Sequence, residues 1–328
     1  MLKIAIILPA HNEELTIASM ISDFHRDCPD ASIWVINNAS RDSTDINAIK
    51  TLDGLGISGG VINENRLGKG NAVRSAFTNI DADIYVICDA DCTYSSSDIS
   101  KLLEPVILGE ADMVVGDRIT GGDYHVENKR ALHSFGNRLL CFLINYLFKS
   151  NLSDTQSGYR VFSRRFVKTY PAIVEGFDIE TNMTVHALHK RLKIVELPVN
   201  YNDRPEGSIS KLNTFSDGYL VLKTLSNIFR HYRPLFFFSA LSLIFFLAGI
   251  FLGYPVIEQH LQTGAITRIP LAILSMGVEV IAFLLMAIGI ILDSIAYHDK
   301  CTFERELILH NTFTKGLKRN NTSFNADL

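Results

Sequence analysis

The stretch KIAIILPAHNEE, residues 3–14, changes character at its proline. The residues between Lys3 and Pro9 are all apolar and include three isoleucines, a composition that favours a buried β-strand. The residues after Pro9 are mostly polar, and a helical stretch begins at Glu13 and continues to Arg26. A short apolar strand followed by a polar turn and a helix is typical of the first unit of a parallel α/β sheet.

The same alternation continues through the next segments of the chain. Further strand-like runs occur at Ser32–Ile36, Gly60–Ile62, Ile84–Cys88 and Met113–Val115. Helical stretches lie between them at Ser43–Leu52, Lys69–Asn79 and Asp98–Gly109. Strands that alternate with helices predict a mostly parallel sheet with helices on both faces. Ligands of such sheets bind beyond the carboxyl ends of the strands.

Polar clusters follow four successive predicted strands. They are Pro9–Glu14, Asn37–Thr44, Asn65–Ala72 and Asp89–Asp91. Each cluster alone is consistent with ordinary turns and helix caps, because Asn, Asp, Ser and Gly are common in both. Their recurrence at four strand ends favours a ligand site at one edge of the sheet.

The last of these clusters has the chemistry of a metal site. Asp89 and Asp91 are one residue apart, just after a buried strand, so they can share a hard divalent cation such as Mg²⁺. Such a cation neutralises the charge that develops on a diphosphate leaving group. Lys69, flanked by glycines, can reinforce the same anion. The chain lacks the Gly-x-x-x-x-Gly-Lys-Ser/Thr pattern, which argues against an ATPase.

The composition changes near residue 234. The run Leu235–Gly253 carries no charge, and a second apolar run, Ile269–Leu292, contains one acid, Glu279. Each is close to the roughly 20 residues needed to cross a hydrocarbon core about 30 Å thick. Two buried soluble helices are the alternative, although such helices normally carry a polar stripe. Glu279 has either a functional role, since an acid inside a membrane is costly, or a polar partner.

Basic residues lie on the outer sides of the two apolar runs. The connecting loop, Tyr254–Arg268, holds a single Lys or Arg, whereas the flanks hold Lys223, Arg230, Arg233, Lys300, Arg305, Lys315, Lys318 and Arg319. The positive-inside rule therefore predicts that both termini are cytoplasmic. The first residues lack the pattern of a secretory signal, which agrees with a domain that folds in the cytoplasm. With 31 basic and 35 acidic residues the net charge is -4, which argues against a nucleic-acid partner.

Taken together, the clusters resemble the motifs of the inverting family 2 glycosyltransferases with a GT-A fold. The segments that carry the resemblance are PAHNEE (9–14), NNASRDST (37–44), GKGNA (68–72) and DAD (89–91). Two downstream segments, SDTQSGYR (153–160) and YNDRPEGSISKL (201–212), resemble the acceptor elements of polyprenyl-phosphate glycosyltransferases. The two apolar runs after them fit the branch related to dolichol-phosphate mannosyltransferase and bacterial bactoprenol glucosyltransferases.

The resemblance implies a domain organisation and a fold class. The fold is α/β, with a GT-A, Rossmann-like domain built on a mostly parallel sheet and followed by two transmembrane helices. The expected parts are a cytoplasmic GT-A domain (1–212), an amphipathic juxtamembrane segment (213–234), two membrane spans (235–253 and 269–292) and a cytoplasmic tail (293–328). A plain linker helix is the alternative for the juxtamembrane segment.

The resemblance also implies the residues of a donor site. The expected contacts of the nucleotide-sugar are Pro9, Ala10, Asn12, Glu13, Asn38, Asp42, Lys69, Asp89 and Asp91. Among them, Asp89 and Asp91 are the expected ligands of Mg²⁺ or Mn²⁺. Asp91 is also expected to be a catalytic residue through its metal.

For the acceptor side, the resemblance implies an in-line displacement with inversion. Asp154 is the expected base or orients the nucleophile, and a helix or turn cap is its alternative role. Arg118, Arg204 and Lys211 are expected to hold the lipid phosphate or the diphosphate. Glu180 belongs to a segment near the acceptor side, with a structural role as the alternative.

The chain departs from the family pattern at two places. Asn37 and Asn38 stand where relatives usually have two aspartates, one of which contacts the base. Because Asn both donates and accepts hydrogen bonds, it suits the N3 donor and carbonyls of uracil better than the paired donors of guanine. The replacement therefore favours UDP over GDP. Thr93 follows the DAD segment where relatives often carry Gln.

The expected function is transfer of glucose or N-acetylglucosamine from a UDP-sugar to polyprenyl (undecaprenyl) phosphate. It would occur at the cytoplasmic face of the bacterial inner membrane, for cell-envelope glycans, and the resemblance is compatible with a homo-oligomer. The alternatives are a GDP-mannose-dependent transferase and a non-catalytic membrane scaffold. A processive polysaccharide synthase would carry a Gln-x-x-Arg-Trp element, but the only tryptophan here is Trp34.

Overall fold

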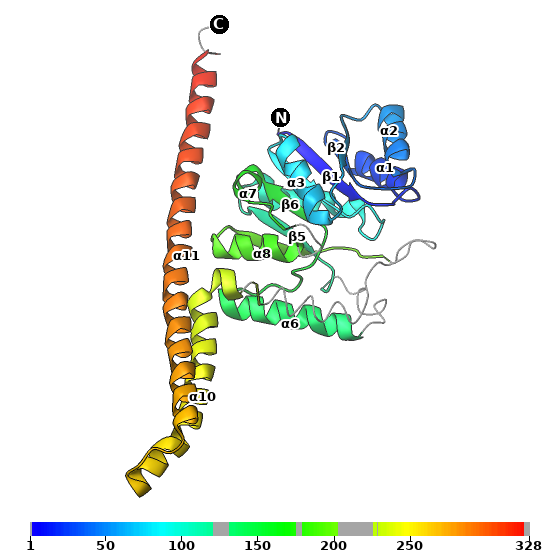
Figure 1. Cartoon of the computed structure of the whole chain (residues 1–328). Coiled ribbons are helices and arrows are strands. Elements are labelled where there is room, and N and C mark those ends of the chain that lie inside the picture. Colours follow the sequence, from blue (N-terminus) through cyan, green and yellow to red (C-terminus); the bar gives the residue numbers. More distant parts are fainter. Residues whose placement is uncertain (1, 121–130, 175–178, 203–225, 228, 325–328) are drawn as a thin grey trace. The chain divides into compact units, whose positions relative to one another are not determined.

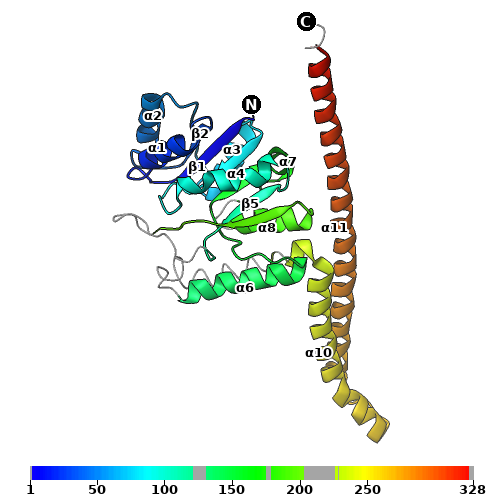
Figure 2. The same cartoon turned by 180° about the vertical axis from the view of Figure 1, so that it is seen from behind.

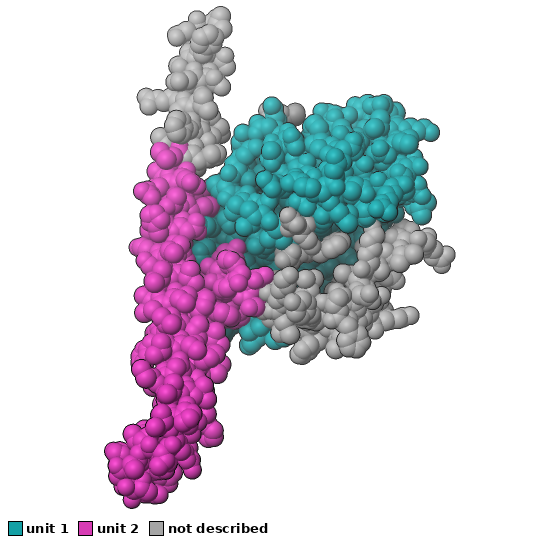
Figure 3. Space-filling model, viewed as in Figure 1, with its two compact units in different colours: residues 1–221 teal, residues 222–328 magenta. Residues whose placement is uncertain are grey.

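A single sheet of seven strands, in the order β3-β2-β1-β4-β6-β5-β7, organises the first part of the chain. The strands are β1 (Ile4–Ala10), β2 (Ser32–Asn38), β3 (Gly59–Glu64), β4 (Ile84–Ile87), β5 (Met113–Asp117), β6 (Arg160–Ser163) and β7 (Ile194–Pro198). The computed structural model describes residues 2–120, 131–174, 179–202, 226–227 and 229–324. The chain divides into two units, residues 1–221 and 222–328, which Figure 3 distinguishes by colour.

The register of the central strands aligns their carboxyl ends. Ile6 of β1 lies opposite Ile33 of β2 and opposite Val86 of β4, and all three pairings of β1, β2, β3 and β4 are parallel. Strand β6 is antiparallel to both of its neighbours, with Val161 opposite Val86 and Val114. The loops after β1, β2, β3 and β4 therefore meet at one edge of the sheet, and the residues before β6 enter at the same edge.

Helices cover both faces of the sheet (Figure 1 and Figure 2). They are α1 (Ile17–Asp27), α2 (Thr44–Leu55), α3 (Lys69–Asn79), α4 (Ile99–Ile107), α6 (Ala131–Phe148), α7 (Arg164–Thr169) and α8 (Ile179–His189), with a 3₁₀ turn at Ser96–Asp98. Phe24 of α1 and Leu102 of α4 belong to the core on one face, beside Ile6 and Val86. Because both faces are buried at the centre of the sheet, the central strands β1 and β4 are continuously apolar.

Aromatic side chains fill the opposite face. The ring of Phe77 from α3 lies 6.0 Å from that of Tyr85 and 5.9 Å from that of Phe162, with the edge-to-face geometry that aromatic pairs prefer. Phe162 also lies 4.7 Å from Phe166 of α7. Burying side chains of this size stabilises the fold by about 1.5–3 kcal/mol each, so this cluster fixes α3 and α7 on the sheet.

The fold class predicted from the sequence is confirmed, and the predicted strands coincide with β1 to β5 within a few residues. The first helix begins at Ile17 rather than Glu13, because residues 11–12 form a bend and residues 14–16 form a turn. The periodic pattern did not predict β6 and β7. These strands have 4 and 5 residues, too few for alternation to be distinct from a loop.

The second unit contains a pair of long helices, α10 (Pro234–Thr263) and α11 (Ile269–Phe324). Both are long and apolar enough to cross a membrane. They pack closely, because the hydroxyl of Ser242 donates to the carbonyl of Ala282 at 2.8 Å and the Glu279 carboxyl lies directly over Gly249. Small residues at such contacts let helix backbones approach one another. Most of the predicted juxtamembrane segment (213–234) lies outside the described residues, namely its residues 213–225 and 228.

Candidate active site

The loops that follow β1, β2 and β3 interlock through hydrogen bonds, and we call them the turn cluster (residues 9–14, 37–44 and 65–68). The ring Nδ1 of His11 lies 2.6 Å from the carbonyl oxygen of Asn38. The amide of Asn12 donates to the hydroxyl of Ser40 at 3.1 Å, and Asn12 Oδ1 accepts from the amide of Arg41 at 2.8 Å. The first and second predicted polar clusters are therefore brought together.

Two residues of the turn cluster adopt the left-handed backbone region. Asn12 has φ 55° and Ala39 has φ 53°. Asn tolerates this region, whereas a residue such as Ala adopts it only where the surrounding structure holds it. Strained backbone of this kind concentrates at functional sites. Both residues line a cleft of about 380 Å³, together with His11, Arg41, Asn65 and Leu67.

Asp42 joins the turn cluster to helix α2. Its Oδ1 accepts from the amide of Thr44 at 3.1 Å, and its Oδ2 accepts from the amide of Glu14 at 3.2 Å. Burial raises the pKa of Asp42, but these hydrogen bonds outweigh it and the pKa is lowered. The hydroxyl of Thr44 accepts from the amide of Glu13 at 2.8 Å. Pro9 and Ala10 form the end of β1, so their backbone borders the same loops.

Asn38 is buried, and its amide group is used within the chain. Its Nδ2 donates to the carbonyls of Glu64 at 3.3 Å and Arg66 at 2.7 Å. Its Oδ1 accepts from the amide of Gly68 at 2.8 Å. Asn37 likewise donates to Asn63 Oδ1, at 2.9 Å. Asn38 therefore supports the turn that leads into α3, and both donations from its amide group go to backbone carbonyls, whereas Asn37 links β2 to Asn63 of β3.

A second group of residues, the charge cluster, contains Lys69, Asp89, Arg118, Asp154, Arg160 and Glu180. Lys69 is the first residue of α3, and its ammonium group forms ion pairs with both Asp89 and Glu180. Burial lowers the pKa of Lys69, but the two carboxylates reverse this effect and raise it, so the lysine stays charged. Glu180 lies in the first turn of α8, where the helix dipole stabilises a negative charge.

Asp91 lies beside Asp89 and is 5% exposed. Its Oδ1 accepts from the hydroxyl of Thr93 at 2.6 Å and from the amide of Thr93 at 3.2 Å. Thr93, the residue that departs from the family pattern, therefore orients the carboxylate of Asp91. Its role could not be assigned from the sequence.

Gly158 brings the acceptor segment, residues 153–160, against Asp89. A Cβ atom built on Gly158 would lie 2.2 Å from Asp89 Oδ2 and 2.7 Å from its Cγ, distances that no side chain tolerates. The amide of Gly158 donates to the hydroxyl of Tyr94 at 2.8 Å, which fixes the backbone in this position. Any residue with a Cβ atom at this position would require the Asp89 carboxylate to move.

Arg118 and Asp154 form a bidentate pair. Arg118 Nε lies 2.6 Å from Asp154 Oδ2, and its Nη2 lies 2.9 Å from Oδ1. Burial raises the pKa of Asp154, but the Arg118 guanidinium outweighs burial and lowers it. The Asp154 side chain is 0% exposed, whereas that of Arg118 is 12% exposed and lies 5.5 Å from the ring of Tyr201. Asp154 is therefore a buried, ionised anchor for Arg118.

Arg160 stabilises the acceptor segment through hydrogen bonds to its backbone carbonyls. It is fully buried, and it donates to the carbonyls of Ser157 and Thr155 at 2.8 Å each and to the hydroxyl of Thr184 at 2.8 Å. Burial lowers its pKa, while the charges of Glu180 and Asp154 act in the opposite direction. Its contacts link the segment around Asp154 to helix α8.

The structure brings together the predicted residues Lys69, Asp89 and Asp91 near strand β4, and Arg118 and Asp154 near β5. Arg204 and Lys211 lie outside the described residues. The sequence did not assign Gly158, Arg160 or Thr93 to the site, and it placed Glu180 on the acceptor side without its lysine partner. The signal for the first two was their position within the SGYR element, residues 157–160.

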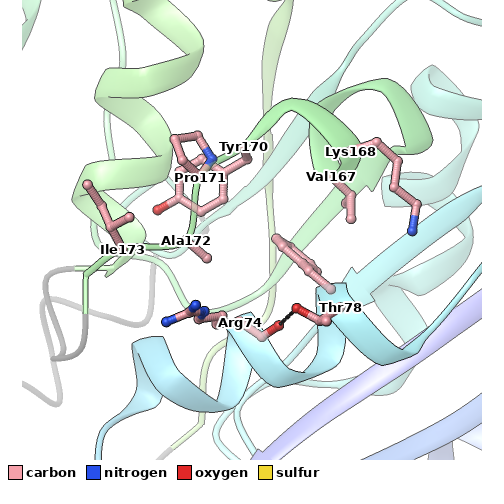
Figure 4. Close-up of a pocket in the computed structure, with 9 residues that line it drawn as sticks. Arg74, Thr78, Val167, Lys168, Tyr170, Pro171, Ala172 and Ile173 are labelled. Atoms are coloured by element: carbon pink, nitrogen blue, oxygen red, sulfur yellow. Dashed lines mark hydrogen bonds between the residues drawn. The ribbon is translucent and has the colours of Figure 1, made fainter. Parts of the chain in front are cut away.

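A second cleft of about 330 Å³ lies between α3 and the α7 region (Figure 4). It is lined by Arg74, Phe77, Thr78, Val167, Lys168, Tyr170, Pro171, Ala172 and Ile173. None of these residues belongs to the predicted site. The cleft beside the turn cluster is lined by one predicted donor residue, Asn12, and therefore fits the predicted donor site better than this second cleft does.

The carboxylates beyond β4 offer oxygen ligands to a divalent metal ion. Among the described residues, no group of three or more His, Cys, Asp or Glu side chains is arranged to hold one. Asp89 and Asp91 nevertheless provide the two carboxylates with which Mg²⁺ is usually bound when substrate phosphates complete its coordination. The residues fit a metal that arrives with a phosphorylated ligand.

The fold is shared with a solved glycosyltransferase. The crystal structure of Mycobacterium tuberculosis glucosyl-3-phosphoglycerate synthase, in complex with Mn²⁺, UDP-glucose and phosphoglyceric acid, has a TM-score of 0.52 and 22% sequence identity. The match covers 70% of this chain and 79% of that chain. Together with the sheet topology, this similarity defines a GT-A glycosyltransferase fold.

Three curated relatives are similar in sequence. Glycosyltransferase AglJ of Haloferax volcanii is 30% identical over 85% of this chain and 91% of its own length. The dolichyl-phosphate hexose transferase of the same organism is 27% identical, over 69% of this chain and 93% of its own. The UDP-N-acetylglucosamine–dolichyl-phosphate N-acetylglucosaminyltransferase of Methanococcus voltae is 26% identical, over 60% and 84%.

Residues 5–170 match the family described as Glycosyl transferase family 2. The matched segment contains the turn cluster, the two aspartates beyond β4, and the Arg118–Asp154 pair. The chain belongs to the family 2 glycosyltransferases, and the protein is a glycosyltransferase.

Proposed function

We propose that the protein transfers a sugar from a UDP-sugar to a polyprenyl phosphate, with inversion at the anomeric carbon. The observation that carries this proposal is the junction at Asp89. There, Asp89, one of two carboxylates suited to a metal with a diphosphate, contacts residues 153–160, which include Asp154, the ion-pair partner of Arg118. The relatives named for dolichyl phosphate acceptors support the choice of acceptor.

The donor is proposed to bind in the cleft beside the turn cluster. A divalent metal ion, Mg²⁺ or Mn²⁺, would be held by Asp89 and Asp91 and would neutralise the diphosphate leaving group. Lys69 adds a further positive charge for that anion. The preference for UDP is supported by the Methanococcus relative, which is a UDP-N-acetylglucosamine transferase, and by the Mycobacterium structure, which is a complex with UDP-glucose. Glucose and N-acetylglucosamine are the proposed sugars.

The acceptor phosphate is proposed to approach Arg118. One phosphate oxygen forms the new bond to the anomeric carbon while the bond from that carbon to the nucleoside diphosphate breaks. A phosphate monoester is already ionised near neutral pH, so positioning contributes more than proton removal. The buried and ion-paired Asp154 fits the orienting role, because it fixes the guanidinium of Arg118. Arg204 and Lys211 are further candidates for the same phosphate.

We also propose that α10 and α11 span the cell membrane, with both termini on the cytoplasmic side. Helix α6 supports a location at the lipid surface. Phe142 and Tyr146 on α6 are 65% and 70% exposed, and Arg138 and Lys149 are exposed on either side of them. Aromatic rings flanked by cations are typical of surfaces that contact lipid headgroups.

The test is a transfer assay with the purified full-length protein in detergent. It contains undecaprenyl phosphate, Mg²⁺ and a panel of labelled UDP- and GDP-sugars, and the lipid phase is extracted. We expect label from a UDP-sugar in that phase, and we expect EDTA to abolish it. Transfer from GDP-mannose would contradict the proposed donor, and the absence of lipid-linked label from every donor would contradict the acceptor.

Asp91→Asn tests the proposed metal site within the same assay. Because Asn keeps the shape but loses the charge, we expect transfer to fall by about 10³-fold. The matched control is Asp112→Asn, at the start of β5. Asp112 is also buried and accepts from Arg165 Nε at 2.8 Å and the amide of Lys193 at 3.0 Å. This control should lower stability and leave the turnover of the folded enzyme unchanged.

A further inference from the structure

The ammonium group of Lys69 lies between two carboxylates that come from different parts of the chain. Asp89 follows β4, and Glu180 begins α8. The side chains of Lys69 and Glu180 are 11% and 7% exposed, whereas that of Asp89 is 31% exposed. Lys69 therefore has one partner inside the protein and another that faces the open part of the site.

The ion pair of Lys69 with Asp89 conflicts with a metal ion on the same carboxylate. Two like charges at ion-pair separation repel by several kcal/mol at the effective dielectric constant of about 20 that describes protein surfaces. The backbone of Gly158 lies close beside Asp89 Oδ2, since a Cβ atom there would be 2.2 Å from that oxygen, so the carboxylate has little room to move toward Gly158. Lys69 and a divalent cation therefore compete for Asp89.

Glu180 provides an alternative position for the same ammonium group. Its backbone is held within α8, where the hydroxyl of Thr184 donates to the Glu180 backbone carbonyl at 3.0 Å and Arg160 donates to that hydroxyl at 2.8 Å. If Lys69 leaves Asp89, its contact with Glu180 keeps both buried charges compensated. A buried carboxylate without a partner would be costly.

We propose that Lys69 is an internal competitor of the divalent metal ion at Asp89, and that Glu180 is the positioning residue that retains Lys69 when the metal binds. This inference rests on the proposed function, because the donor diphosphate is the anion that draws Lys69 away from Asp89. Without the nucleotide, Asp89 is neutralised by Lys69 and binds metal weakly. With the nucleotide, the diphosphate takes the lysine charge and Asp89 becomes available to the metal.

The test is Mn²⁺ binding to the full-length protein in detergent, first with the metal alone and then with UDP or GDP present. Removing the competing charge in Lys69→Met should strengthen Mn²⁺ binding without nucleotide by about tenfold or more. The strengthening of Mn²⁺ binding by UDP should be smaller than in the wild type, because part of that coupling acts through Lys69. Equal Mn²⁺ affinity of Lys69→Met and wild type without nucleotide would overturn the inference.

Lys168→Met is the matched control. Lys168 lies at the second cleft and forms an ion pair with Asp81 at 3.4 Å. The substitution removes the same charge from the same domain, so Mn²⁺ affinity should stay within about twofold of the wild type. A strengthening equal to that of Lys69→Met would show that net charge alone is responsible and would overturn the inference.

Glu180→Gln separates the positioning role of Glu180 from a direct effect of its charge on the metal. Because it preserves the side-chain shape, it also provides a second test if Lys69→Met does not fold. With Asp89 as its only carboxylate partner, Lys69 should compete more strongly, so Mn²⁺ binding without nucleotide should weaken by about tenfold. In the Lys69→Met background the same substitution should have a much smaller effect. An equal weakening in both backgrounds would show that Glu180 acts directly, against the inference.

The transfer assay distinguishes the two proposals. Absence of transfer to polyprenyl phosphate in a protein that shows the expected Mn²⁺ pattern would overturn the proposed function and leave Lys69 as the competitor. Transfer by the wild type, with Mn²⁺ affinity unchanged in both Lys69→Met and Glu180→Gln, would overturn the inference and leave the function.

Discussion

The turn cluster and the charge cluster lie at the same edge of one sheet but are built from different interactions. In the turn cluster, amide and hydroxyl groups of residues such as Asn12, Asn38 and Thr44 bond to backbone groups of neighbouring loops. In the charge cluster, buried ionised groups compensate one another, as in Arg118 with Asp154. The first cluster shapes a cleft, and the second positions charge.

The two kinds of interaction differ in what their loss costs. A typical neutral hydrogen bond contributes about 0.5–1.5 kcal/mol to stability, because water replaces it in the unfolded chain. Removing one member of a buried ion pair costs about 3–5 kcal/mol, because the remaining charge has no compensation. We therefore expect the turn cluster to tolerate change in its residues far better than the charge cluster.

Asp154→Asn should have the largest effect on stability. It leaves the guanidinium of Arg118 without its carboxylate, so the free energy of unfolding should fall by about 3 kcal/mol or more. Trp34, the only tryptophan, lies in β2 and reports unfolding of this unit by fluorescence during urea titration. A fall of less than about 1 kcal/mol in the free energy of unfolding would mean that this pair contributes no more than an exposed ion pair. The charge cluster would then be no more sensitive to substitution than the turn cluster.

The pH dependence of this pair has a defined sign. Because the pKa of Asp154 is lowered in the folded protein, its contribution is fully present above the unfolded value of about 3.9 and is lost as pH falls through the folded value. The stability difference between wild type and Asp154→Asn should be constant from about pH 8 to pH 5 and shrink only below about pH 4. A difference that already declines near pH 6 would contradict the assignment.

Gly158→Ala should have the second largest effect, because it tests the contact between the acceptor segment and Asp89. The added methyl group would overlap the Asp89 carboxylate and should cost about 2–3 kcal/mol in the free energy of unfolding. Transfer should fall by about 10² or more, since displacement of reacting groups by about 1 Å has that effect. Urea unfolding followed by Trp34 fluorescence and initial transfer rates measure the two effects.

Gly54→Ala is the control for this substitution. Gly54 lies in α2, and a Cβ atom there meets nothing within 4 Å. Alanine is the better helix former, so this variant should be more stable than the wild type by about 0.5–1 kcal/mol and should keep its activity. Equal behaviour of the two variants would show that Gly158 is not in tight contact with Asp89.

Much of the turn cluster could be predicted from the sequence, because each of its loops is formed by residues that are consecutive in the chain. The strand Ile4–Ala10, its polar turn and the helix after it are encoded in consecutive residues, and parallel strands necessarily align such turns. The aspartates beyond β4 were predictable for the same reason. The register that places Asn12 against Ser40 follows from the pairing of β1 with β2.

The charge cluster could be predicted only in part, because its pairs join distant segments. Nothing near Lys69 indicates that Glu180 is its partner, since α8 reaches it through tertiary packing. The Arg118–Asp154 pair likewise joins the loop after β5 to the segment before β6, a strand too short to predict. The sequence supplied Arg118 from its position after the fifth predicted strand and Asp154 from the resemblance to a family, and the structure shows that one anchors the other.

Asn38→Asp should have the smallest effect, and it tests whether the turn cluster only shapes the cleft. An aspartate cannot donate to the carbonyls of Glu64 and Arg66, so the free energy of unfolding should fall by about 1–2 kcal/mol. If Asn38 acts only through this turn, the affinities for UDP and GDP should fall by similar factors in calorimetric titrations. Asn65→Ala, in the same cleft, is the matched control for a general loss of nucleotide binding.

A change of more than about tenfold in the ratio of UDP to GDP affinity would contradict this view, because tenfold corresponds to about 1.4 kcal/mol of base-specific interaction. Asn38 would then contact the base directly, as the family pattern at this position implies, and its hydrogen bonds to Glu64 and Arg66 would exchange for bonds to the base when the donor binds. An unchanged ratio would instead place donor selection in other residues of the cleft, among them His11 and Arg41.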